Sequence, residues 1–279
     1  MMKCATVQPM VDQTVCKICN AKTSELFDFL LLQQHLAKLR QCSNCGFEFI
    51  ENPIWLADSF LSSLNQFDVG SADRSLIVAG FVRSLFSRKQ ASRVKVLDFG
   101  GGDGLATRTL RDSGIDCRWE DPYCQPVFAV GPDQSEINHF DLVFMSEVAL
   151  HLTDPLEMIK SLTARSDRLL MTAVVPPEKI GTDWWYLMPQ TGQHVAFYPV
   201  DTLRWIAKCL SLHLLTDGRF FHQFSSVRPS FLERVMFKVP QLAMLRWKLM
   251  EIGDLIRRGL GRHKGLTASD QDSLGRKVL

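Results

Sequence analysis

The sequence predicts an α/β protein with a doubly wound, mostly parallel sheet, a small cysteine-rich unit before it and a helical tail after it. Three observations support this prediction. Residues 94–224 alternate apolar, strand-like runs with helical stretches, which is the pattern of βαβ units. Two Cys-x-x-Cys pairs precede this region, and a basic segment with apolar residues at helical spacing follows it. A chain of 279 residues accommodates one catalytic domain and a small accessory unit.

The cysteine-rich unit is predicted to span residues 1–50 and has the spacing C-x2-C-x22-C-x2-C. The four cysteines are Cys16, Cys19, Cys42 and Cys45. Each pair is followed by a residue suited to a tight turn, Asn20 or Gly46. Four thiolates at such spacing bind one tetrahedral Zn2+, which replaces the core that a short segment lacks. We therefore predict a structural zinc ribbon, with a hairpin or a short helix between the pairs; a redox pair would usually occur once, beside a βαβ unit.

The rest of the chain is predicted to contain a helical connector over residues 51–90 and the main domain over residues 91–228. The predicted strands of the domain are 94–99, 116–119, 140–145, 168–174, 195–198, 212–216 and 220–226. The predicted helices of the domain are 104–113, 155–163 and 200–209. Only 19 residues separate Asp121 from Asp141, so we expect the third strand to be a stub at residues 127–130.

The tail, residues 229–279, is predicted to be a basic helical extension interrupted by Pro240. Residues 228–279 carry 11 Lys/Arg against 5 Asp/Glu, although the whole chain has a formal net charge of only +2. Such a helix can lie on an anionic membrane as a peripheral contact. Packing against the domain or a second subunit is the simpler interpretation, and we favour it from the sequence. We expect a cytoplasmic protein, because neither an apolar leader nor a run of about 18 apolar residues is present.

A glycine-rich turn follows the first strand of the domain in VKVLDFGGGDGLATRTL. Gly100, Gly101 and Gly102 let the backbone approach a ligand closely because they carry no Cβ, and the helix behind them offers free N–H groups. Asp121 lies 23 residues after Asp98, at the end of the next strand. An acid at that position accepts hydrogen bonds from both ribose hydroxyls of a nucleoside. The turn therefore predicts a nucleoside-containing ligand.

The order D-x-G-x-G-x-G resembles motif I of the class I S-adenosylmethionine-dependent methyltransferases. FDLVFMSEVALHLTDP, residues 140–155, resembles the fourth-strand stretch of the same family. The resemblance covers roughly residues 94–215 and implies a Rossmann-like fold with S-adenosylmethionine as cofactor. The implied cofactor-binding residues are Asp98, Gly100, Gly101 and Gly102 at the methionine part, Asp121 and Pro122 at the ribose and adenine, and Met145, Ser146 and Glu147 on the sulfonium side. The acid that contacts the adenine amino group in this family would correspond to Asp133.

Two of the seven histidines, His151 and His194, follow predicted strands at the edge of the sheet where a ligand binds. VALHLTD and QHVAFYPVDTL resemble the motifs V-L-x-H-x-x-D and E-H-x-x-[YF]-[FY]-S of bacterial sugar and polysaccharide-pathway methyltransferases that carry an N-terminal zinc-binding domain. Gln193 stands where that group has glutamate. A neutral amide orients a histidine but cannot share its proton, which favours methylation of oxygen over carbon.

His194 is therefore the candidate general base for a hydroxyl acceptor, with His151 as a second catalytic candidate. Hydrogen bonding to the substrate and packing beneath aromatic residues remain alternatives for His194. His151 also fits a residue that caps or packs a helix. The aromatic residues near His194 either stack on a sugar ring or form core or a lid; they are Trp184, Trp185, Tyr186, Phe197 and Tyr198.

Together these features predict methyl transfer from S-adenosylmethionine to a small-molecule or glycan acceptor in polysaccharide biosynthesis, most consistently on oxygen. One alternative is an RNA methyltransferase that recognises its substrate with the zinc ribbon, and another is a cofactor-binding protein without catalysis. Residues 1–50 carry five Lys/Arg against four Asp/Glu, which is a weak electrostatic footprint for a polyanion. Nucleic acid is thus not the partner we expect, although the basic tail leaves it open.

Overall fold

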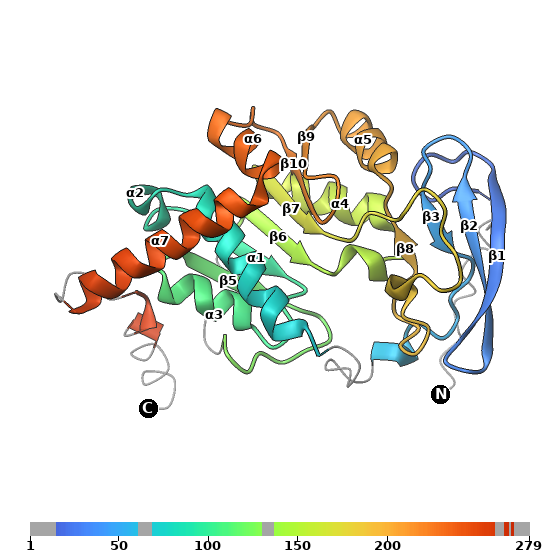
Figure 1. Cartoon of the computed structure of the whole chain (residues 1–279), viewed down its shortest axis with the longest axis horizontal. Coiled ribbons are helices and arrows are strands. Elements are labelled where there is room, and N and C mark those ends of the chain that lie inside the picture. Colours follow the sequence, from blue (N-terminus) through green and yellow to red (C-terminus); the bar gives the residue numbers. More distant parts are fainter. Residues whose placement is uncertain (1–14, 61–68, 130–136, 260–264, 268, 271–279) are drawn as a thin grey trace, which may run out of the picture.

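The computed structural model describes residues 15–60, 69–129, 137–259, 265–267 and 269–270. A six-stranded central sheet has helices on both faces, and a four-stranded antiparallel sheet lies at one end of it (Figure 1). The strands of the central sheet are β4 (Lys95–Phe99), β5 (Asp116–Glu120), β6 (Leu142–Ser146), β7 (Arg168–Thr172), β9 (His213–Thr216) and β10 (Phe221–Ser225). The strands of the smaller sheet are β1 (Thr23–Leu31), β2 (His35–Cys42), β3 (Glu48–Ile50) and β8 (Ala196–Phe197).

The helices of the described region agree with the alternating pattern of the sequence. The α-helices are α1 (Ser71–Leu85), α2 (Arg88–Ala91), α3 (Leu105–Asp112), α4 (Pro155–Ala164), α5 (Val200–Cys209), α6 (Phe231–Lys238) and α7 (Pro240–Gly259). Three short 3-10 helices are η1 (Asp58–Phe60), η2 (Ala149–His151) and η3 (Trp185–Leu187). The helical tail is interrupted before Pro240, which is the first residue of α7, as expected for a residue without a backbone N–H donor. None of the helices in the described part of the chain is long and apolar enough to cross a membrane.

The central sheet has the strand order β5-β4-β6-β7-β10-β9. Strands β5, β4, β6 and β7 are parallel, and β10 runs antiparallel to both β7 and β9. The predicted doubly wound α/β fold is therefore confirmed. The chain order reverses between β4 and β6, and a ligand in such a sheet binds in the crevice outside the carboxyl ends of those strands.

The core explains why the central strands are almost continuously apolar. Val96 and Phe144 pack with α1, α3, α6 and α7 on one face, whereas Leu97 and Met145 pack with α4 and α5 on the other. Both faces are covered, so side chains that alternate along one strand are buried on opposite sides. This packing positions the carboxyl ends of β4 and β6 rigidly beside each other.

The predicted third strand is wrong over residues 127–129, which are not a strand. Instead, the backbone N–H groups of Val127 and Phe128 both donate to the carbonyl oxygen of Asp103, at 2.9 Å each. The segment closes over the glycine-rich turn, because Ala129 packs directly against Gly104. Within the described residues β5 is therefore the edge strand on the β4 side of the central sheet. Outside them lie Val130 and Asp133.

The smaller sheet joins the N-terminal unit to the main domain. The segment between the cysteine pairs forms the hairpin β1–β2, which decides between the two alternatives left open by the sequence. Residues 195–198 do contain a strand, but β8 does not belong to the central sheet. It pairs with β3, with Phe197 opposite Glu48 and Ala196 opposite Phe49. The place beside β7 is taken by β10.

Candidate functional site

The glycine-rich turn after β4 adopts a conformation that suits glycine. Gly100 and Gly102 have φ of +70° and +54°, in the left-handed region. A Cβ at Gly102 would have no heavy atom of the described residues within 4 Å, so the backbone there faces open space. The carboxylate of Asp121 holds the turn: one oxygen accepts the N–H of Gly102 at 2.9 Å, and the other accepts the N–H groups of Tyr123 and Cys124. The turn can thus take a ligand against its backbone.

Asp98 lies beneath this turn and is almost fully buried. Its carboxylate accepts a hydrogen bond of 2.9 Å from the Thr107 hydroxyl of α3. A Cβ on Gly101 would lie 2.8 Å from the Asp98 carboxyl carbon, so only glycine lets the turn pass over this side chain. Burial raises the pKa of Asp98 to about 7, against the hydrogen bond from Thr107, which lowers it. Asp98 therefore titrates close to neutral pH.

The segment after β5 borders the open side of the turn. The Trp119 indole N–H donates to the Gly102 carbonyl oxygen at 3.2 Å. Pro122 and Tyr123 are exposed, and so are Val127 and Phe128 further along the segment. This surface is apolar and open, which suits the flat ring of a nucleoside base.

The carboxyl end of β6 holds the next group of predicted residues. Met145 is fully buried in the core, Ser146 is half-buried, and Glu147 has a positive φ of +56°. This φ is rare for a residue with a side chain and marks a position held by its surroundings. The Glu147 carboxylate accepts hydrogen bonds from the Thr172 hydroxyl at 3.2 Å and the Tyr186 hydroxyl at 2.6 Å. Burial and then the charge of Glu147 raise the pKa of Tyr186, so its hydroxyl keeps the proton that it donates.

His151 and His194 are brought together at this edge, with ring centroids 5.4 Å apart. Nδ1 of His194 lies 2.7 Å from the carbonyl oxygen of Tyr186, and Nδ1 of His151 lies 2.8 Å from that of Gln193. A carbonyl oxygen only accepts, so in each ring Nδ1 carries the hydrogen. In the neutral form of both histidines Nε2 is then the basic nitrogen.

The segment that carries His194 is held mainly by the N-terminal half of the chain. The indole N–H of Trp55 donates to the Gly192 carbonyl oxygen at 2.9 Å, and β8 follows directly in the smaller sheet. The Gln193 side chain donates to the Ser59 carbonyl oxygen at 2.7 Å. The expectation that the Gln193 amide orients His194 is therefore wrong, because this amide bonds to the connector. It is the backbone of Gln193 that orients His151.

Most aromatic residues around His194 belong to the core. Tyr186, Phe197 and Tyr198 are buried, and the Tyr198 hydroxyl donates to the Ala149 carbonyl oxygen at 2.6 Å. Trp185 is the exposed member of the predicted set. The core interpretation is therefore confirmed for the three buried rings.

Phe60 is a site residue that the sequence did not point to. Its ring stacks on Tyr123 and meets His151 edge-on, with centroid distances of 5.3 Å in both cases. Three distant segments meet here, so no local pattern could have revealed the contact.

A pocket of about 430 Å³ lies beside the segment before His194. Its lining residues are Leu32, Gln34, His35, Ile54, Trp55, Asp58, Ser59, Gln190 and Thr191. They come from the β1–β2 turn, the connector and the loop after β7. No Lys or Arg is among them, and Asp58 is their one carboxylate. The pocket therefore suits a polar ligand without negative charge.

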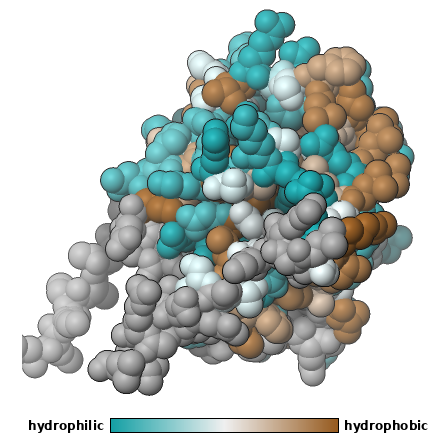
Figure 2. All heavy atoms as spheres, turned by 90° about the vertical axis from the view of Figure 1, so that its left-hand side faces the viewer, coloured by the Kyte–Doolittle hydropathy of each residue, from teal (hydrophilic) through white to brown (hydrophobic). Residues whose placement is uncertain are grey.

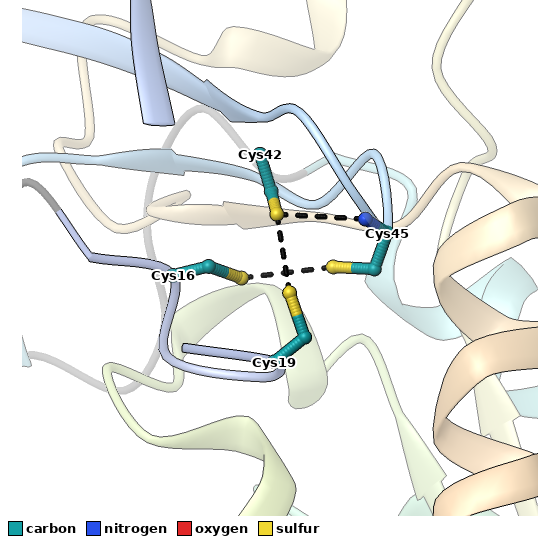
Figure 3. A group of neighbouring side chains, drawn as sticks. All are labelled: Cys16, Cys19, Cys42 and Cys45. Atoms are coloured by element: carbon teal, nitrogen blue, oxygen red, sulfur yellow. Dashed lines mark hydrogen bonds between the residues drawn. The ribbon is translucent and has the colours of Figure 1, made fainter. Parts of the chain in front are cut away.

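The four cysteines of the N-terminal unit converge on one point (Figure 3). Their sulfur atoms all lie within 4.8 Å of one another, with Cys16 and Cys45 at 3.6 Å and Cys19 and Cys42 at 3.2 Å. Four thiolates at ~2.3 Å from one Zn2+ have sulfurs about 3.8 Å apart, so this arrangement fits a tetrahedral zinc. Backbone N–H groups point at the sulfurs, as from Ile18 to Cys16 at 3.4 Å. The residues after each pair have positive φ, as predicted.

The zinc-binding group is attached to the main domain. Cys16, Cys42 and Cys45 belong to the same buried cluster as α4, α5 and one face of the central sheet. The Thr202 hydroxyl of α5 donates to the Cys45 carbonyl oxygen at 2.8 Å. A bound Zn2+ would thus stabilise both the smaller sheet and its contact with α5.

Comparisons with known proteins give one decisive match. Residues 73–215 match the methyltransferase-domain family, and no curated protein matches the chain. Among solved structures, the chain is similar to the mitomycin 7-O-methyltransferase MmcR, at 14% identity over 62% of this chain and 67% of that chain, with a TM-score of 0.41. It is also similar to magnesium protoporphyrin IX methyltransferase from Synechocystis PCC 6803 with bound SAM, at 17% identity over 59% and 83%, with a TM-score of 0.39.

The family match is enough to identify the main domain. It covers slightly more than half of the chain, from α1 to β9, and includes the glycine-rich turn, Asp121, Glu147 and both histidines. The open backbone of Gly102 at the reversal of strand order is where the cofactor of this family would lie. The chain belongs to the methyltransferase-domain family and is an S-adenosylmethionine-dependent methyltransferase.

Proposed function

We propose that this enzyme methylates a hydroxyl group of an uncharged sugar or glycan acceptor, with His194 as the general base. The observation that carries this proposal is the hydrogen bond from Nδ1 of His194 to the Tyr186 carbonyl oxygen, 2.7 Å long, which leaves Nε2 as the basic nitrogen. S-adenosylmethionine supplies an electrophilic methyl group. Nε2 takes the hydroxyl proton while the acceptor oxygen bonds to the methyl carbon, and the electron pair of the broken carbon–sulfur bond stays on sulfur.

The remaining predicted residues have supporting roles in this proposal. Gly100, Gly101 and Gly102 form the backbone cradle of the cofactor, and Asp98 lies at its methionine part. Asp121 and Pro122 lie at its ribose and adenine, and Ser146 and Glu147 at its sulfonium side. Met145, which the sequence also assigned to that side, is fully buried in the core and supports the end of β6 instead. His151, which meets the His194 ring edge-on, limits the orientations open to it. The zinc held by the cysteines would have a structural role.

Three neighbouring features favour an uncharged glycan acceptor. The pocket beside residues 190–191 offers carboxylate and amide groups from Asp58, Gln34 and Gln190, which hydrogen-bond to sugar hydroxyls. Its lining has no Lys or Arg that would attract the phosphates of RNA. Thr191 lies three residues from His194, so one acceptor of two sugar rings can reach both places. Resemblance to sugar-pathway methyltransferases supports a place in polysaccharide biosynthesis.

The proposed function is tested by acceptor preference. The purified enzyme is incubated with S-adenosylmethionine labelled on its methyl group and with separate glycan and RNA fractions of the native host. We expect label in base-stable ether linkage on the glycan fraction. Transfer to RNA alone, with an affinity that falls steeply as salt rises, would replace this proposal with the RNA alternative. If calorimetry detects no binding of S-adenosylhomocysteine, both the glycan proposal and the RNA alternative are ruled out.

The pH dependence of cofactor binding tests the role of Asp98. Its carboxyl has a pKa of 3.8 when free and about 7 in the fold. Between these values the unfolded chain is ionised and the folded chain is not, so the stability of the cofactor-free enzyme falls as pH rises through this window. The cationic ammonium of the cofactor needs the ionised carboxylate. We expect S-adenosylhomocysteine to bind about tenfold more tightly at pH 8 than at pH 6. Asp98→Asn should bind weakly at both, and an unchanged pH dependence in this variant would assign the titration to another group.

We also propose that the chain has four structural parts: 1–50, 51–90, 91–228 and 229–279. Strand β8 lies in the third part of the sequence. In the structure, however, it pairs with β3 in the sheet of the first part. This pairing matters for the proposed function, because the N-terminal unit then helps to hold the segment that carries His194 in position.

A further inference from the structure

Helix α7 has a second apolar face that no described residue covers. Its inner face packs on α1, where the Trp247 ring lies on Gly80, a position at which a Cβ would collide with it. At 100° per residue, a second set of apolar side chains lies on the opposite side of the helix. These side chains are 44–61% exposed and are Leu242, Leu245, Leu249, Ile252 and Ile256. We refer to these five residues as the outer stripe.

The outer stripe extends into a larger apolar surface at this end of the molecule. Phe231, Leu232 and Val239 of α6 and the linker to α7 are also exposed. Figure 2 faces the end of the molecule at the left of Figure 1 and shows apolar side chains gathered there beside hydrophilic ones. Single exposed apolar residues are common on proteins, but a contiguous surface of this kind marks an interaction site.

Positive charge borders the outer stripe. Around the helix axis, Arg246 and Arg257 lie on one flank of the outer stripe, and Lys248 lies on the other flank, where it pairs with Glu251 at 3.1 Å. Arg88 and Arg83 share the one carboxylate of Asp254, at 3.0 and 3.9 Å. Arg246 lies near Arg83 and lines a groove together with Arg88, so three guanidinium groups lie in a region with one buried acid, which leaves it cationic.

A groove lies between the arginine side chains and the apolar surface. It measures about 410 Å³ and is lined by Ser87, Arg88, Leu242, Leu245, Arg246, Leu249 and Met250. Nε of Arg246 is buried and has no hydrogen-bond partner among the described residues. Leucine side chains thus form one wall, and guanidinium groups that can bind an anion form the other.

We propose that the outer stripe and this groove bind the surface of an anionic phospholipid membrane, with the leucines among the acyl chains and a lipid phosphate at Arg88 and Arg246. Charge decides against a second copy of this chain as the occupant. Two outer stripes packed together would bring Arg246 and Arg257 of both copies close together, whereas an anionic surface neutralises these charges. Lys248 already pairs with Glu251 of its own helix. The proposal is independent of the acceptor proposed above.

Sedimentation with vesicles tests this proposal on the full chain. We expect binding to phosphatidylcholine vesicles that contain phosphatidylglycerol, weakened by salt, and little binding to phosphatidylcholine alone. Leu249→Glu/Ile252→Glu should lower the affinity at least tenfold. Arg246→Gln/Lys248→Gln should lower it about 25-fold, at about 1 kcal/mol for each basic residue. Leu36→Glu, at an exposed leucine of the β1–β2 hairpin, is the matched control and should bind like the unchanged enzyme.

Three outcomes would overturn the proposal. The first is equal binding by the Leu249→Glu/Ile252→Glu variant and the unchanged enzyme, with S-adenosylhomocysteine binding as the check of folding. The second is a dimer in light scattering that this variant dissociates, which would make the outer stripe a contact between copies. The third is inorganic phosphate displacing the enzyme from vesicles at equal total ionic strength, which would make the groove a site for free phosphate.

Discussion

Replacement of His194 with alanine is expected to slow methyl transfer by about 10²–10⁴-fold, the usual contribution of a general base. The acceptor hydroxyl would then have to lose its proton to water. Cofactor affinity should stay the same, because His194 bonds to Tyr186 and meets the His151 ring, whereas the glycine-rich turn of the cofactor lies between β4 and α3. The measurement is single-turnover transfer of labelled methyl, beside calorimetry with S-adenosylhomocysteine.

A matched control separates loss of the base from loss of an aromatic ring. His139→Ala removes an exposed histidine that bonds to Asp167 on the surface, 3.0 Å away, and should leave the rate unchanged. Added imidazole should restore part of the activity of His194→Ala, because it replaces the basic nitrogen. Full turnover by His194→Ala would show that this ring only packs. A loss that imidazole does not restore, in a variant that still binds cofactor, would assign His194 to positioning the acceptor.

Replacement of Cys42 with serine is expected to release zinc and to lower methyl transfer by about 10²-fold or more, while cofactor binding remains. Structural zinc contributes about 10–16 kcal/mol to the folding of small zinc-binding peptides, so the smaller sheet should not survive its loss. That sheet holds β8 through β3. Trp55 of the connector, whose ring stacks on His35 of β2, holds the segment before His194 through Gly192. A displacement of about 1 Å at a catalytic group costs roughly 10²-fold in rate. The glycine-rich turn lies on β4 and α3, away from this sheet.

The control for this prediction is Cys209→Ser, which removes an exposed thiol at the end of α5. It should keep about one zinc per chain and full activity. Zinc content by plasma mass spectrometry, methyl transfer and S-adenosylhomocysteine affinity are measured for both variants. A Cys42→Ser variant that lacks zinc but keeps full activity would show that the N-terminal unit does not position His194. A metal-free unchanged enzyme with a folded smaller sheet would remove zinc from the proposal altogether.

Local patterns were enough to predict most elements of the main domain. The helix expected at residues 200–209 has those bounds in the structure, and the strands that became β4 and β7 begin within one residue of their predicted starts. These elements follow from local sequence, because apolar side chains repeat with the period of a helix or a strand. The interruption of the helical tail is also local, because Pro240 cannot continue a helix. The glycine-rich turn could also be predicted from the local sequence, because its positive φ values favour glycine regardless of the surrounding structure.

The expected third strand failed for the opposite reason. Residues 127–129 are apolar enough for a strand, but a strand also needs a partner with free backbone groups. Here the N–H groups of Val127 and Phe128 bond to the carbonyl oxygen of Asp103 instead, which closes the chain over the glycine-rich turn. Strand pairing depends on partners that are distant in the sequence, so the local sequence of residues 127–129 does not show whether they form a strand.

By itself, the sequence determined the α/β fold, the family, the cysteine spacing that fits zinc, and the acid and glycines of the cofactor turn. Only the tertiary structure decided what surrounds His194. Two residues of β8 pair with β3 instead of the central sheet, Tyr186 orients His194, and the Gln193 amide bonds to the connector. These contacts join residues 8 to 149 positions apart, and at such distances along the chain the choice of partner depends on how the whole core packs rather than on local spacing.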